Sequence, residues 1–132
     1  MTTTITAEKN SARTCALAKL AQITRLLRLR DRCNAAGHCD WADEIQRQID
    51  ELPLSVEVRT GWHAPGDYNE TGEYRILLTW GGPAVQIVGE LTSFGEPDNA
   101  ALQCQDWLTS WETVAADEIV LLDFARNFYF GN

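Results

Sequence analysis

The hydrophobic period of the chain changes at Pro53. Before Pro53, apolar residues recur every three or four positions, as on one face of a helix; after it they alternate, as on one face of a strand. Both kinds of apolar face must be buried, so helices and a sheet have to pack together. The sequence therefore predicts an α+β fold, and 132 residues suit one domain with one core.

The first part of the chain, residues 1–52, predicts a helical hairpin. One helix is expected over residues 7–36, ended by Gly37, and a second begins at Asp40 as its N-cap and ends before Pro53. The apolar stripes are Ala16, Leu20, Ile23 and Leu27 in the first helix and Trp41, Ile45, Ile49 and Leu52 in the second. A link this short makes the two helices antiparallel.

The second part, residues 53–132, predicts an antiparallel sheet and a last helix. Four strands are expected, over residues 54–60, 74–80, 85–91 and 101–108. Their turns are too short for the crossover that parallel strands need, so they form a meander. A helix over residues 114–130, closed by Gly131, is apolar enough to need cover on most sides and is expected across the sheet.

The motif "WGGP" predicts a turn. A phosphate-binding loop needs a helix beyond its glycines to supply aligned N–H donors, and here a strand follows Pro83. Tyr74, Ile76 and Leu78 alternate on the inward face of the second strand, and Trp80 continues that alternation, so we expect Trp80 to be buried. Trp80→Ala should then lower the free energy of unfolding by about 3–5 kcal/mol. Trp62 and Trp111 lie in loops and are expected to be exposed anchors for a partner.

The spacing of the cysteines and histidines does not favour a metal site or a catalytic cysteine. Cys33, His38 and Cys39 stand close together, but the spacing is not that of a zinc site, and a fourth ligand from Cys15 or Cys104 would depend on chance geometry. A cysteine nucleophile could be Cys104 with His63 or Cys33 with His38, yet the sequence shows neither base geometry nor an oxyanion hole. We expect reduced thiols and predict no metal, no cofactor and no enzyme activity.

Charge is distributed unevenly. Residues 1–50 carry eight Lys/Arg and six Asp/Glu (+2), whereas residues 51–132 carry three Arg and thirteen Asp/Glu (−10). The carboxylates Glu90, Glu96, Asp98 and Asp106 could include a glycosidase pair, but acids are common everywhere in this half, so a solvated surface is favoured. A surface this acidic is unsuited to a phosphate backbone and suits a basic protein.

Three arginines of the first helix, Arg25, Arg28 and Arg32, fall on one face. With Lys19 and Arg30 nearby they could touch nucleic acid. The alternative is a solvated face whose arginines pair with Asp31 or Asp50, and the acidity of the chain favours it.

Part of the chain resembles known sequences. The run "RTGWHAPG…EYRILLTWGGPAVQIVGEL…GEP…ALQCQDWLTSW…FARNFYFG", within residues 54–131, resembles small uncharacterised proteins of tailed phages and prophages of Gram-negative bacteria. The resemblance implies a phage accessory protein and supplies no site residues. The N-terminus has neither a secretory signal nor a membrane span, so the host cytoplasm is expected.

The leading hypothesis is a non-enzymatic protein that binds and inhibits a host nucleic-acid-processing defence complex, of the anti-CRISPR or anti-restriction kind, by imitating nucleic-acid charge. The expected partner-binding residues are Glu96, Asp98, Asp117, Glu118, Trp62 and Trp111. The partner would be a host protein complex, with no direct contact to nucleic acid or membrane. Two alternatives stay open: a small phage enzyme or metal protein that uses the Cys/His residues, and a virion structural or morphogenesis component.

Overall fold

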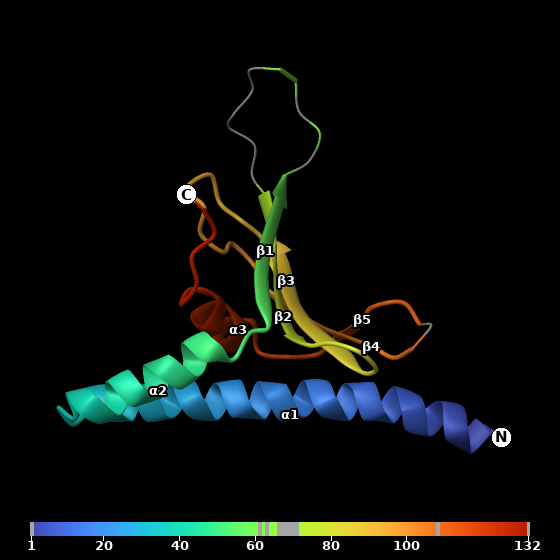
Figure 1. Ribbon diagram of the computed structural model, residues 1–132, viewed down its shortest axis with the longest axis horizontal. Helices are drawn as coiled ribbons and strands as arrows, with labels where there is room; N and C mark the ends of the chain where they lie inside the picture. Colours follow the sequence, from blue (N-terminus) through green and yellow to red (C-terminus); the bar gives the residue numbers. More distant parts are fainter. Residues whose placement is uncertain (1, 61, 63, 66–71, 108, 132) are drawn as a thin grey trace.

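The fold combines two N-terminal helices, a five-stranded antiparallel sheet and a C-terminal helix (Figure 1). The computed structural model describes residues 2–60, 62, 64–65, 72–107 and 109–131. The elements in chain order are α1 (Thr2–Ala35), α2 (Cys39–Glu51), β1 (Ser55–Thr60), β2 (Gly72–Thr79), β3 (Ala84–Glu90), β4 (Ala101–Gln105), β5 (Glu112–Val114) and α3 (Glu118–Ala125). The predicted α+β class is confirmed, and the count of four strands was wrong.

The sheet is a meander in the order β1-β2-β3-β4-β5. Every neighbouring pair is antiparallel, as predicted for the first three pairs, and "WGGP" is the turn between β2 and β3. One row across the sheet joins Ile76, Ile87, Leu102 and Val114, all of them buried. Burying one such side chain stabilises the fold by about 1.5–3 kcal/mol, so this row is a main part of the core.

The helices cover one face of the sheet. Figure 1 shows α1 running across one end of the strands, α2 lying along the C-terminal half of α1, and α3 beside the sheet. The small side chains of Ala12 and Ala16 are buried, which lets α1 approach β4 closely. Phe124 of α3 and Ile49 of α2 complete the same core. The opposite face of the sheet carries no helix.

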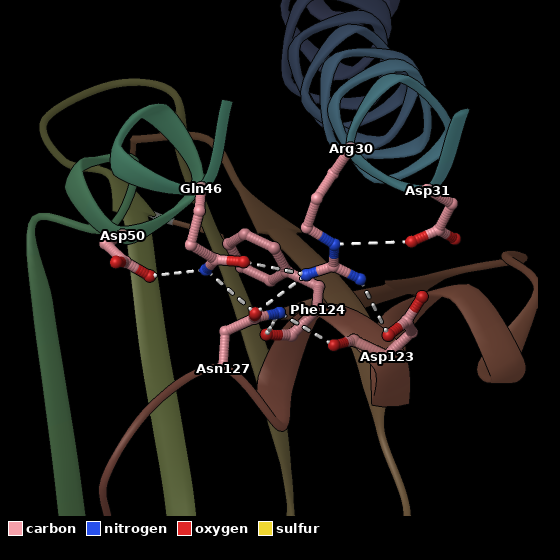
Figure 2. A network of polar contacts seen from close by, with 7 residues as sticks. All are labelled: Arg30, Asp31, Gln46, Asp50, Asp123, Phe124 and Asn127. Carbon is pink, nitrogen blue, oxygen red and sulfur yellow. Dashed lines mark hydrogen bonds and ion pairs between the residues drawn. The ribbon is translucent and has the colours of Figure 1, made fainter. Parts of the chain in front are cut away.

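A polar network joins the three helices (Figure 2). The Arg30 guanidinium of α1 donates to Gln46 Oε1 at 3.1 Å and to Asn127 Oδ1 at 2.9 Å, and it lies 3.5 Å from Asp123 Oδ1. Asn127, just after α3, donates through Nδ2 to the carbonyl oxygens of Asp123 and Phe124. Arg30, expected beside the basic face, is instead mostly buried and tethers α1 to α2 and α3.

The expected burial of Trp80 was wrong, because its side chain is 70% exposed. Tyr74, Ile76 and Leu78 are buried as the alternation requires. The register of β2 against β3 then shifts between Leu77 and Thr79, and β2 ends at Thr79. Trp80 therefore lies beyond the last paired residue, in the turn, where strand alternation no longer sets its direction.

Helix boundaries also differ from those predicted. α2 begins at Cys39, and His38 rather than Asp40 is its N-cap, without a side-chain hydrogen bond. Trp41, placed on the apolar face by its spacing, is 68% exposed, and the buried residue of the first turn is its neighbour Ala42.

The C-terminal helix is shorter than the expected residues 114–130. β5 takes up Val114, Asp117 caps α3, and the helix ends at Ala125, so Gly131 does not close it. In α3, Leu121, Phe124 and Ala125 are buried, and Val120 and Leu122 pack partly buried against the core. Cover on most sides was therefore right for this helix apart from Glu118 and Ile119, which are exposed.

Candidate partner-binding surfaces

The turn between β3 and β4 presents Glu96 and Asp98 to solvent. Backbone bonds hold this turn: Thr92 N donates to Glu96 O at 2.7 Å, and Asp98 N donates to Glu90 O at 2.8 Å. The Thr92 hydroxyl accepts from Glu96 N at 3.2 Å. These bonds fix the backbone that carries both carboxylates, and neither carboxylate makes an ion pair within the described residues.

The start of α3 lies against the same turn. Asp117 caps the helix, because its side chain accepts from Ile119 N at 3.0 Å. The Glu118 Oε2 atom accepts from Ala100 N at 3.4 Å, two residues beyond Asp98. The structure therefore brings together two pairs of acids that the sequence separates by about twenty positions.

Five carboxylates thus gather at one end of the sheet: Glu90, Glu96, Asp98, Asp117 and Glu118, here called the acidic end. None of them makes an ion pair among the residues that the structure describes. Burial raises the pKa of the Tyr74 phenol, Glu118 raises it further, and Arg126 lowers it. Arg126 is therefore a basic group near this end, and Arg59, in the same row of the sheet as Glu90, is paired with Glu73.

The two tryptophans predicted as anchors differ in exposure. Trp62, which follows β1 at the acidic end of the sheet, is fully exposed, as expected. Phe94 in the β3–β4 turn is also exposed, so aromatic surface accompanies the acids. Trp111, also expected to be exposed, is only partly so, and it lines a groove on the open face of the sheet.

That open-face groove has a volume of about 670 Å³. Its walls include two ion pairs across β1 and β2, Arg75 with Glu57 at 2.9 Å and Arg59 with Glu73 at 2.7 Å. Exposed pairs such as these add at most about 1 kcal/mol each, so their main effect is to line the groove with planar polar groups.

The floor of the groove contains Gln86 of β3, which is only 4% exposed. Its Nε2 donates to Gln103 Oε1 on β4 at 2.8 Å, while its Oε1 has no hydrogen-bond partner. Neither glutamine was predicted from the sequence to belong to a site. The available signal was a polar residue inside the apolar run "AVQIV".

The cysteines and histidines do not assemble into a site in the described part of the chain. No group of three His, Cys, Asp or Glu side chains is placed to hold a metal ion there. His38 and Cys39 are exposed, Cys33 is partly buried, and His63 lies outside the described residues, as do Asp67 and Glu70.

Cys104 is a core residue. It is buried, and burial raises the pKa of its thiol, with Glu112 adding to the effect. A raised pKa disfavours the thiolate, which is the nucleophilic form.

The carboxylates Glu90 and Asp106 stand at opposite ends of the sheet, so they do not form a pair across one cleft.

The three arginines of α1 form a second charged surface. Arg25, Arg28 and Arg32 are exposed and make no ion pair among the described residues. The expected pairing with Asp31 or Asp50 was wrong: Asp31 pairs with Arg30, and Asp50 accepts from Gln46. A shallow groove of about 530 Å³ between Leu17 and Leu29 runs beside them.

Comparison with protein-family models, curated proteins and solved structures found no match. In the described part of the chain, no helix has the length and apolar character to cross a membrane.

Proposed function

We propose that this chain is a non-enzymatic binding protein of phage origin that inhibits a host nucleic-acid-processing defence complex, of the anti-CRISPR or anti-restriction kind. The observation that carries the proposal is the acidic end. Five carboxylates, from the end of β3, the β3–β4 turn and the start of α3, make no ion pair among the described residues and lie at the same end of the sheet as exposed Trp62 and Phe94. Such a surface complements the basic groove in which a nuclease holds its substrate.

The mechanism is occupation of that groove. The carboxylates take the positions of backbone phosphates, and the exposed aromatics add contact area at low entropy cost. The turn is held by its own backbone bonds, so the spacing of the charges is fixed before binding. Dissolved salt screens the attraction between exposed charges, so inhibition should weaken steeply as the salt concentration rises.

The test is inhibition of DNA cleavage by purified CRISPR effectors and restriction enzymes of Gram-negative hosts. One variant carries Glu96→Lys with Asp98→Lys, since both side chains are exposed and neither is in the core. A second carries Asp117→Lys with Glu118→Lys, which also removes the cap of α3 and should melt slightly lower. Each should abolish inhibition while the domain stays folded.

A third variant tests the arginine surface, with Arg25, Arg28 and Arg32 each changed to Glu. It should keep full inhibition. If both acidic variants stay folded and inhibit DNA cleavage fully while the arginine variant no longer inhibits it, α1 carries the binding and the proposal is wrong.

A further inference from the structure

The Gln86 amide is an unusual feature of the sheet. Its neighbours Val85 and Ile87 point into the core, so Gln86 points to the open face, where it lies on the floor of the groove. A buried polar atom without a partner costs about 1–3 kcal/mol, and a valine or leucine would avoid that cost. The chain nevertheless carries an amide there.

The amide pair has one unfilled position at Gln86 whichever way it is oriented. As assigned, Gln86 Nε2 bonds Gln103, and its buried Oε1 has no partner among the described residues, so a ligand in the groove bonds it once the side chain turns toward the groove. If both amides were turned over, Gln86 would instead present an unfilled N–H donor. Only a ligand group that both donates and accepts satisfies Gln86 in either orientation, and a hydroxyl does so.

The rest of the groove narrows the ligand class. Glu57 and Arg75, which bond each other, and Asn99, whose Oδ1 accepts from Glu90 N, bring planar polar groups to the groove, and their remaining donors and acceptors can bond neighbouring hydroxyls. Trp111 offers an apolar ring to pack against C–H groups. The volume of about 670 Å³ lies within the range of about 300–1,000 Å³ typical of ligand sites.

Two other ligand classes fit less well. A peptide backbone pairs with the edge of a sheet, whereas Gln86 is in β3, the central strand of five. A nucleotide would bring phosphate to a groove whose lining has the acids Glu57, Glu73 and Glu90 against Arg59 and Arg75. The excess of one negative charge disfavours it.

We propose that the open-face groove binds a neutral saccharide, with Gln86 bonded to a ring hydroxyl and Trp111 packed against the ring. This site lies beyond the proposed inhibitory function and does not depend on it. Reversal of Glu96 and Asp98 should leave saccharide binding unchanged, and loss of saccharide binding should leave inhibition unchanged.

The experiment is NMR titration of the full chain with the methyl glycosides of glucose, galactose, mannose and N-acetylglucosamine. Binding on the order of millimolar is expected for one ring. The side-chain amide signals of Gln86 and Gln103 and the indole N–H of Trp111 should shift together. Gln86→Leu should weaken binding about tenfold or more without lowering the melting temperature, since it removes an unpaired amide.

Gln48→Leu, an exposed glutamine of α2 outside the groove, is the matched control and should bind as the unchanged protein does. Gln103→Met is a second groove variant, to be used if Gln86→Leu does not fold. The proposal is overturned if no glycoside shifts these signals, or if Gln86→Leu binds equally well. It is also overturned if adenosine or an Asn-containing peptide shifts them and the glycosides do not, or if Gln86 bonds a water only.

Discussion

Gly89→Ala should destabilise the fold strongly, although it adds a single methyl group to a strand. Gly89 of β3 stands directly opposite Tyr74 of β2. The Tyr74 ring lies over it, and its hydroxyl donates to the Asn99 carbonyl oxygen at 2.6 Å. A Cβ atom at Gly89 would overlap both that carbonyl oxygen and the Tyr74 ring, so the backbone of the turn or the ring would have to move.

The size of the effect follows from three contributions. Overpacking against backbone costs about 1–3 kcal/mol. Losing the Tyr74–Asn99 hydrogen bond adds about 1–3 kcal/mol, because both groups are buried or partly buried. Alanine has fewer conformations than glycine in the unfolded chain, which offsets about 0.4–1 kcal/mol of this loss. A net loss of about 3 kcal/mol, for a chain of 132 residues, lowers the melting temperature by about 11 °C.

The assay is thermal and urea unfolding, with Gly82→Ala as the control. A Cβ atom at Gly82 would also overlap a neighbour, but that neighbour is the ring of Trp107, which is 76% exposed and can swing aside. Gly82→Ala should therefore cost less than about 1 kcal/mol. Adding Tyr74→Phe to Gly89→Ala should cost less than the sum of the two single changes, since both remove the same hydrogen bond. Equal losses at Gly89 and Gly82 would refute the reasoning.

Three further predictions test other parts of the fold. Arg30→Ala should lower the free energy of unfolding by about 2 kcal/mol, because Gln46 and Asn127 lose a shared charged donor, while the exposed Arg28→Ala should change it by less than about 0.5 kcal/mol in the same denaturant titration. Trp80→Ala should leave the melting temperature nearly unchanged, against the 3–5 kcal/mol loss that burial would imply. Burial raises the pKa of Tyr74 above its unfolded value near 10, so the stability that its neutral phenol contributes is complete below pH 10 and is lost as the pH rises from 10 through the raised pKa. When the free energy of unfolding is measured at alkaline pH, Tyr74→Phe should therefore lose less stability above pH 10 than the unchanged protein.

The sequence predicted the elements where local pattern decides the structure. The change of period at Pro53 separates the helices from the sheet, and short turns imply antiparallel pairing, which the structure confirms for the three predicted strand pairs. A glycine inside a strand pattern indicates close approach of another backbone, so Gly89 could have been recognised from the sequence as well.

The sequence could not predict features that depend on register. The register shift between Leu77 and Thr79 and the end of β2 at Thr79 leave Trp80 outside the paired strand, and no local signal marks either feature. β5 has three residues and forms only because β4 offers an edge. The pairing of Gln86 with Gln103 follows from the alignment of β3 and β4, which single-sequence patterns do not specify.

Asn99 links the core to both proposed surfaces. Its carbonyl oxygen accepts from the buried Tyr74 hydroxyl, and its Oδ1 accepts from Glu90 N at 2.8 Å. One residue thus fixes the backbone just after Asp98 and lines the open-face groove. A change that frees Asn99 should therefore disturb the spacing of the carboxylates and the shape of the groove together. Gly89→Ala would act through this residue, so its loss of stability should be accompanied by weaker inhibition and weaker saccharide binding, whereas Arg30→Ala, which loosens the helices alone, should lower stability and leave both kinds of binding intact.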